Sequence, residues 1–190
     1  SSPCLSCGTG AACGGCAAAK TGSDGGGYKL AGQLGLRIVP TVPSLVQLRC
    51  SDGFFKIVAG VRCEAGITLY AGAGTAGRER VQEERGELQF TDYGISGIPV
   101  FQLSRQAAYL LREKKTVTSS IDFFPCMDRQ EFEELCAKRL SGAKGKNMEE
   151  FLLGMANKKI NLLMLKLAGL KPEQKAGATG RKELKRLLFS

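Results

Sequence analysis

Residues 86–104 have the sequence GELQFTDYGISGIPVFQLS, which changes from a strand pattern to a helix pattern within a few positions. Glu87–Phe90 alternates polar and apolar side chains and predicts a strand. Ser96-Gly97-Ile98-Pro99 predicts the start of a helix, because proline is tolerated in a first helical turn. The apolar stripe that continues this helix consists of Val100, Leu103, Ala107, Leu110 and Leu111. We therefore expect a strand, a short connection and a helix of about four turns.

The flanking sequence predicts further strands. Glu79–Glu84 comes before the opening stretch, with Arg85-Gly86 as a two-residue hairpin connection. Thr116–Phe123 comes after it and places Val117, Ser119, Ile121 and Phe123 on one face. The other expected strands are Ser44–Arg49, Phe54–Val58 and Val61–Tyr70. Several short strands joined by tight turns predict a small antiparallel β-barrel or sandwich.

The last third of the chain predicts helices, so the expected class is α+β. Arg129–Leu140 is amphipathic. A capping-box pattern from Asn147 to Glu150 predicts a long helix that ends near Ala168. Thr179 is the expected cap of a final basic helix, residues 180–189. Tyr28–Leu34 predicts one more short helix near the start, with Tyr28 as a core residue.

Composition excludes several kinds of chemistry. The chain has 190 residues, enough for one domain with a small satellite, and no histidine. A Ser-His-Asp or Cys-His nucleophile and a His-ligated metal are therefore impossible within it. It has no apolar run long enough to span a bilayer and no signal-peptide pattern, so we expect a cytoplasmic protein without a membrane partner.

The net charge of +9 lies in one part of the chain. Residues 138–190 hold 13 Lys and Arg against 4 Asp and Glu, whereas the preceding residues are neutral. A basic nucleic-acid-binding module that uses Lys182, Lys185 and Arg186 is one alternative. Solvated helix faces are the favoured interpretation, because this block has few aromatic side chains on which bases could stack.

Cysteines supply a second alternative. The chain has eight, and Cys4, Cys7, Cys13 and Cys16 form a C-x2-C-x5-C-x2-C pattern that could hold zinc or an iron–sulfur cluster. The spacer is shorter than in zinc ribbons and does not match the ferredoxin pattern. We therefore expect no metal, and the small Cys4 metal-binding module stays an alternative.

Residues 12–31, ACGGCAAAKTGSDGGGYKLA, carry most of the chemical information. Glycines just before a helix let backbone N–H groups approach a phosphate or a flat ring, and the helix dipole adds to the attraction. The stretch is neither a G-x-G-x-x-G after a strand nor a Walker loop. By itself it is a weak indication of a ligand site.

Four segments resemble, in order and spacing, a known flavoprotein family. Residues 12–35 resemble its A-T-G-G-x-x-x-P-x-T-G-S-x-G-x-G-Y segment, and VPSLVQL (42–48) its P-A-L-V-P-L strand. The opening stretch resembles its G-E-L-x-F-T-x-x-G-L-S-G motif, and residues 147–170 its helical part. The family comprises NAD(P)/FAD-dependent oxidoreductases of the aminoacetone-oxidase type and includes a bacterial bile-acid dehydro-intermediate reductase. Cys13 and Ala19 depart from the family's Thr and Pro.

The resemblance implies a β-barrel and helical region inserted in a Rossmann-like FAD domain that is largely absent here. It implies a glycine-rich edge of the FAD domain at 1–35, a β-rich insert with one helix at 36–125 and a helical subdomain at 126–190. The cofactor-binding residues implied are Gly14, Gly15, Thr21, Gly22, Gly25 and Gly27.

The implied enzyme binds FAD and acts on a small organic substrate. This segment would cover the flavin and shape substrate access, with the remainder of the FAD domain as its partner and no nucleic acid. NAD(P)H is a candidate electron donor, and oxygen is the other electron partner considered. The chain alone is expected to be inactive. No catalytic acid or base is identified, and Asp92 and Tyr93 are candidates for the substrate side.

Overall fold

The computed structural model describes residues 13–72, 77–143 and 145–189. The chain divides into two compact units after Pro43. The first holds the glycine-rich loop, a short 3₁₀ turn η1 (Ala19–Thr21) and helix α1 (Gly26–Gln33). Gly35 follows α1 with a left-handed φ of +81°, as expected for a glycine that ends a helix.

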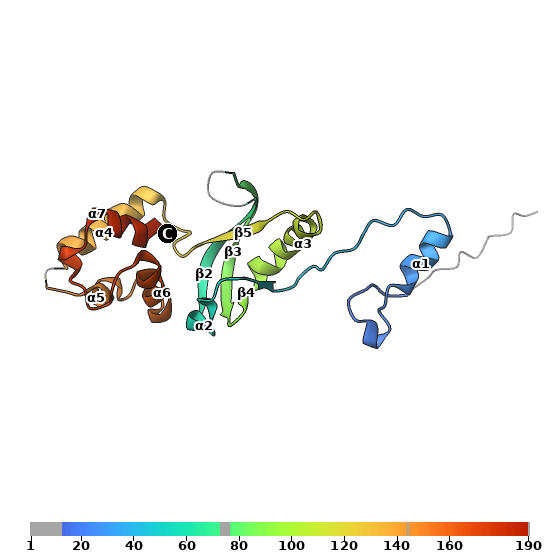
Figure 1. Cartoon of the computed structure of the whole chain (residues 1–190), viewed down its shortest axis with the longest axis horizontal. Coiled ribbons are helices and arrows are strands. Elements are labelled where there is room, and N and C mark those ends of the chain that lie inside the picture. Colours follow the sequence, from blue (N-terminus) through green and yellow to red (C-terminus); the bar gives the residue numbers. More distant parts are fainter. Residues whose placement is uncertain (1–12, 73–76, 144, 190) are drawn as a thin grey trace, which may run out of the picture. The chain divides into compact units, whose positions relative to one another are not determined.

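The second unit is built on a five-stranded sheet with the order β1-β4-β3-β2-β5, in which every neighbouring pair is antiparallel (Figure 1). The strands are β1 (Leu48–Arg49), β2 (Arg62–Ala71), β3 (Glu79–Thr91), β4 (Gly94–Ser96) and β5 (Val117–Asp122). The long β2–β3 pair forms its centre. The sheet curls into a half-barrel, so the expected α+β class with a small antiparallel barrel is confirmed.

The two faces of the sheet differ because side chains alternate along a strand. Ala65, Ile67 and Leu69 of β2 and Leu88 and Phe90 of β3 point to the inner face and are buried. The outer face carries charged pairs, such as Arg62 with Glu87 and Arg85 with Glu64. Helix α3 (Ile98–Arg112) and the short α2 (Phe55–Val58) pack on the inner face and complete the first core.

Two glycines explain the FTDYGISG motif that opens α3. Gly94 has φ +154°, and a Cβ there would overlap the Leu48 carbonyl oxygen of the neighbouring β1. Gly97 has φ +114°, and a Cβ there would overlap the Glu87 carbonyl oxygen of β3. Neither position has room for a side chain. The absence of a Cβ lets β1 pack closely against β4 and the start of α3 pack closely against β3.

The helical part consists of α4 (Arg129–Ser141), α5 (Met148–Leu152), α6 (Lys158–Ala168), a 3₁₀ turn η2 (Ala176–Ala178) and α7 (Arg181–Phe189). Helix α6 joins the two cores. Its Ile160 and Leu163 pack with the sheet, whereas Leu165 and Ala168 pack with α5 and α7 residues. The Lys159 ammonium also donates to the Ala59 carbonyl oxygen (3.0 Å), beside α2.

The expected hairpin at Arg85-Gly86 is wrong. Strand β3 runs through both residues, which pair with Gly66 and Ala65 of β2. Gly86 lies in mid-strand opposite Pro99 of α3, whose ring atoms approach to 3.5 Å of where a Cβ would be. The glycine therefore serves helix packing, and the actual two-residue turn between β3 and β4 is Asp92-Tyr93.

Three other expectations need correction. Phe54–Val58 is not a strand: it contains the one-turn helix α2, which buries Phe55 and Val58 at a helical spacing of three. The long helix from the Asn147 capping box, which is confirmed, breaks at Gly154 (φ +78°), and Asn157 caps a separate α6. Of the strand expected at 44–49, only β1 forms.

Thr179 does not cap the last helix. Its hydroxyl donates to the Lys175 carbonyl oxygen (3.3 Å), and the Glu183 carboxylate instead accepts from the Gly180 N–H (2.9 Å). Among the described residues, the longest helix is α3, and no helix is long and apolar enough to cross a membrane.

Candidate functional site

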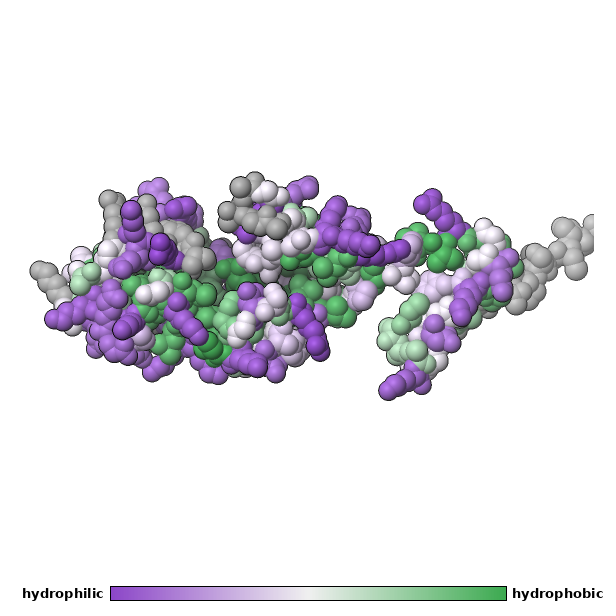
Figure 2. Space-filling model, viewed as in Figure 1, coloured by the Kyte–Doolittle hydropathy of each residue, from purple (hydrophilic) through white to green (hydrophobic). Residues whose placement is uncertain are grey.

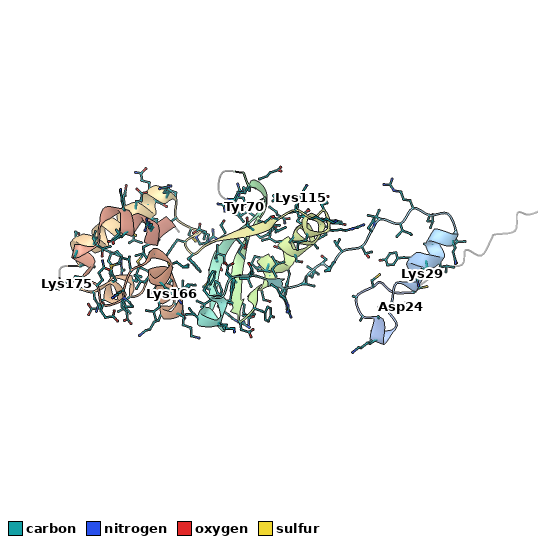
Figure 3. All side chains as sticks on the ribbon, viewed as in Figure 1. Asp24, Lys29, Tyr70, Lys115, Lys166 and Lys175 are labelled. Atoms are coloured by element: carbon teal, nitrogen blue, oxygen red, sulfur yellow. The ribbon has the colours of Figure 1, made fainter. Side chains whose placement is uncertain are left out.

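The glycine-rich loop folds back on itself ahead of α1. The Gly25 N–H donates to the Gly15 carbonyl oxygen (3.0 Å), and Ala18 forms a bridge with Ser23. The Thr21 hydroxyl donates to the Ala18 carbonyl oxygen (3.0 Å), which leaves its lone pairs to accept from a ligand. Asp24 lies at the start of α1 (Figure 3), where its carboxylate accepts from the Gly26 N–H (2.9 Å).

The five glycines predicted to contact the cofactor differ in what surrounds them. Gly14, Gly22 and Gly25 have left-handed φ values of +69°, +92° and +83°, so each is required by the backbone. Nothing lies within 4 Å of a Cβ built at Gly15 or Gly22, so the structure leaves room for a ligand at these two positions.

The other glycines of the loop have internal neighbours. A Cβ at Gly25 would meet the Cys16 sulfur at 2.8 Å, and one at Gly27 would meet the Cys13 Cβ at 2.9 Å. The missing side chains at Gly25 and Gly27 therefore leave space for Cys16 and Cys13, and this space is not available to a ligand. The cofactor-binding role of the whole set stays a prediction.

The Cys4 metal alternative falls partly outside the described residues, which begin at Cys13. Cys13 and Cys16 are free and exposed. Within the described ranges, no three His, Cys, Asp or Glu side chains gather in a way that could hold a metal ion.

Tyr28 is not the core residue that its helical spacing predicts. Its side chain is 38% exposed, and α1 buries no residue. A side chain of this eight-residue helix is buried only where another segment packs on it. The described part of the first unit buries no residue of α1.

Asp92 and Tyr93 occupy the tight turn between β3 and β4. Asp92 is exposed, whereas Tyr93 is half-buried and stacks under the Arg49 guanidinium, 5.2 Å from the ring centroid. The Tyr93 carbonyl oxygen also accepts from the Cys50 N–H (3.0 Å). These contacts give the turn a structural role in holding β1 and do not test a role toward substrate.

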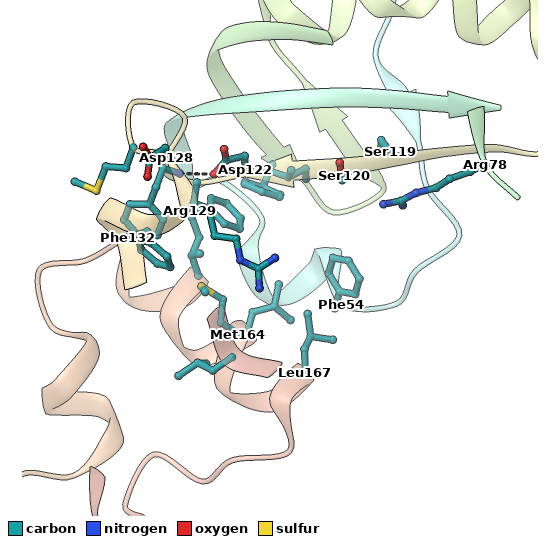
Figure 4. A pocket seen from close by; sticks show the side chains of 18 residues that line it. Phe54, Arg78, Ser119, Ser120, Asp122, Asp128, Arg129, Phe132, Met164 and Leu167 are labelled. Carbon is teal, nitrogen blue, oxygen red and sulfur yellow. Dashed lines mark hydrogen bonds between the residues drawn. The ribbon is translucent and has the colours of Figure 1, made fainter. Parts of the chain in front are cut away.

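A cavity of about 670 Å³ opens beside β5, and no residue of α3 lines it (Figure 4). Its walls are mostly apolar and come from β3, β5, the start of α2, α4, α6 and α7. Phe54, Phe90 and Phe123 line it from the sheet side, and Met164 and Leu167 line it from α6. Apolar surface gathers in the region where α2 and α6 meet (Figure 2).

Charged groups lie at the rim of this cavity. Arg78, just before β3, and Arg129, at the start of α4, both line it. Asp122 and Asp128 also line it, but each carboxylate accepts a backbone N–H at 2.8 Å, from Phe124 and Glu131 respectively. No periodic pattern in the sequence predicts this site, because its walls come from segments far apart in the chain.

The partly buried thiols are poor nucleophiles. Burial, assisted by Asp52, raises the pKa of Cys50, and burial with a contribution from Glu64 raises the pKa of Cys63. Burial also raises the pKa of Cys136, against a smaller opposite effect of Arg139. Only the thiolate is reactive, so these three cysteines have packing roles.

The basic block lies on the helical part, where Lys166 and Lys175 are exposed (Figure 3). Lys158 pairs with Glu149 at 2.8 Å. Exposed ammonium groups of this kind are typical of solvated helix faces, and nothing here tests the nucleic-acid alternative.

Comparison with known proteins agrees with this architecture. Residues 42–189 match the family model described as HI0933-like protein barrel and H2TH domain. Over 160 residues the chain is 40% identical to the 3-dehydro-bile acid delta(4,6)-reductase of Clostridium scindens. The matched part covers 84% of this chain but 38% of that protein, so the chain spans well under half the length of its relative.

The family match begins two residues before the second compact unit and covers the sheet and all the helices of that unit. It confirms the resemblance to flavoprotein oxidoreductases seen in the sequence motifs. The chain therefore belongs to the HI0933-like family of FAD-dependent oxidoreductases, and its residues 42–189 are the barrel and H2TH domain of that family.

Proposed function

We propose that the chain acts as part of an FAD-dependent oxidoreductase for a small organic substrate, in which the half-barrel and helices cover the flavin and shape substrate access. The observation that carries this proposal is the 40% identity to a reductase over 160 residues. The relative is a bile-acid reductase by name, so a largely apolar organic acid is the substrate class that it suggests. A nicotinamide or oxygen would be the other electron partner.

The glycine-rich loop fits one edge of a flavin site. Gly15 and Gly22 leave open space for a flat ligand, and the Thr21 oxygen keeps lone pairs for a hydrogen bond. When bound, FAD would supply the redox chemistry, as cofactors do in such enzymes. This chain would contribute backbone and hydroxyl contacts and would exclude water, and no described side chain is assigned as acid or base. Asp24 disfavours a phosphate at the start of α1, because its carboxylate already takes the Gly26 N–H.

A chimera tests the proposal. The matched segment of the Clostridium scindens reductase is replaced by this chain, and the purified chimera is assayed for bound FAD by its visible absorbance. We expect close to one equivalent of FAD. The isolated 190-residue chain should hold far less, because one edge of a dinucleotide site binds weakly.

Two glycine variants locate the contact. A Cβ at Gly15 would meet nothing within 4 Å, and the position has no positive φ, so we expect Gly15→Val to lower FAD content with little change in stability. Gly53→Val is the matched control, because Gly53 is equally open but lies in the second unit. A folded chimera without FAD, or equal FAD content in the two variants, would contradict the proposed contact.

A further inference from the structure

The cavity beside β5 has the size and lining of a small-molecule site. Its volume of about 670 Å³ lies within the range of roughly 300–1,000 Å³ that is typical of ligand pockets. We infer that it binds an elongated, mostly apolar organic acid, with the carboxylate at Arg78 and the hydrocarbon body between β5 and α6. That this acid is the substrate rests on the proposed function, whereas the binding itself does not.

The walls of the cavity suit an apolar ligand body. The Phe90 and Phe123 rings lie 6.2 Å apart and form the floor over the sheet. On the opposite side, Met164 has a flexible thioether that adapts to the shape of a ligand. Leu167 is 55% exposed at the same wall, so an apolar ligand would cover surface that is otherwise in contact with water.

Arg78 supplies the recognition of an anion. Its guanidinium lies over the Tyr70 ring, 4.0 Å from the ring centroid, and it points toward the cavity in Figure 4. This contact orients the group and uses none of its in-plane N–H donors. In the part of the chain that the structure describes, no carboxylate lies within ion-pair distance of Arg78.

The other charged groups at the rim are already engaged. Asp122 and Asp128 accept backbone N–H groups, and Arg129 pairs with Glu133 at 3.1 Å. A bound carboxylate is therefore expected at the Arg78 end, beside Ser119 and Ser120, which also line the cavity.

A tryptophan reporter tests this inference in the 190-residue chain without flavin. The chain contains no tryptophan, so Leu167→Trp places a single indole at the cavity wall. The matched control is Leu153→Trp, at a residue that is 71% exposed and does not line the cavity. The ligand is cholanoic acid, a saturated tetracyclic acid with no chromophore and no reducible bond, and its methyl ester is the uncharged analogue.

We expect the acid to shift the emission of the Leu167→Trp variant and to leave that of the Leu153→Trp variant unchanged. Adding Arg78→Ala should weaken acid binding about tenfold to a hundredfold, because a hydrogen-bonded ion pair is lost. Arg78→Lys should recover part of that affinity, and the ester should bind equally with or without Arg78. Calorimetry on the unsubstituted chain gives the same constants without the reporter.

Three results would overturn the inference: no saturable binding of the acid by calorimetry, equal responses from the two tryptophan positions, or an affinity for the acid that Arg78→Ala does not change. None of these would affect the FAD content of the chimera. Conversely, a chimera without FAD would leave the binding of cholanoic acid by the chain unaffected, so the two proposals fail separately.

Discussion

Replacing Gly97 by alanine should destabilise the second unit more than replacing a glycine that also has a positive φ but has open space around it. Gly97 has φ +114°, and its Cβ would overlap the Glu87 carbonyl oxygen. Gly60 has φ +82°, with nothing within 4 Å of its Cβ, and it serves as the control. A positive φ costs an alanine about 1–2 kcal/mol at Gly60 and at least as much at Gly97, whose ψ of 169° lies outside the left-handed helical region.

At Gly97 a second cost is added. The clashing atom belongs to the β3 backbone and cannot rotate away, so β3 and the start of α3 must move apart. Overpacking of this kind costs about 1–3 kcal/mol. We therefore expect Gly97→Ala to lower the free energy of unfolding by about 2–5 kcal/mol and Gly60→Ala by about 1–2 kcal/mol.

Urea unfolding followed by far-ultraviolet circular dichroism measures this difference. With a denaturant dependence of about 2 kcal/mol per molar urea, the midpoint should fall by about 1–2.5 M for Gly97→Ala and by about 0.5–1 M for Gly60→Ala. Equal midpoints for the two variants would refute the claim that the motif's glycine exists to let α3 approach β3.

Three further outcomes follow from buried polar groups and thiols. Asn161 is 6% exposed and its amide donates to the Leu152 and Ala156 carbonyl oxygens at 2.9 and 3.1 Å; Asn161→Leu should therefore cost about 2–4 kcal/mol in urea unfolding, and an unchanged stability would contradict this. Cys126 is exposed, so an aromatic disulfide reagent should modify it before Cys136, with serine variants assigning each phase. Burial raises the pKa of Cys136 above its ordinary 9.0, so its contribution to stability is complete below pH 9 and should fall as pH rises above it; Cys136→Ser should lose less stability over that window.

Much of the second unit could be predicted from periodicity. Strand β5 and helix α4 have the expected faces, and α3 begins where the proline indicates. Each of these elements buries one face and exposes the other. The spacing of its apolar residues is therefore enough to predict whether it is a helix or a strand.

The errors have a common physical origin in tertiary contacts. Gly86 was interpreted as a turn, but it lies in mid-strand because Pro99 of α3 packs on it. The apolar run at α2 is too short for periodicity to separate a strand from a helical turn. The cavity was missed for the same reason, since residues such as Phe54 and Leu167 meet only after folding. The glycine-rich loop could be singled out from the sequence because its glycines lie close together in the chain.

The central claim is that this chain serves as the flavin-covering part of a reductase, and turnover by the chimera tests it most directly. With this chain in place of the matched segment, the chimera should retain FAD and reduce the substrate of the Clostridium scindens enzyme at a measurable fraction of its rate. A chimera that folds and holds FAD, yet reduces neither that substrate nor any other organic acid supplied, would contradict the claim that these residues shape substrate access.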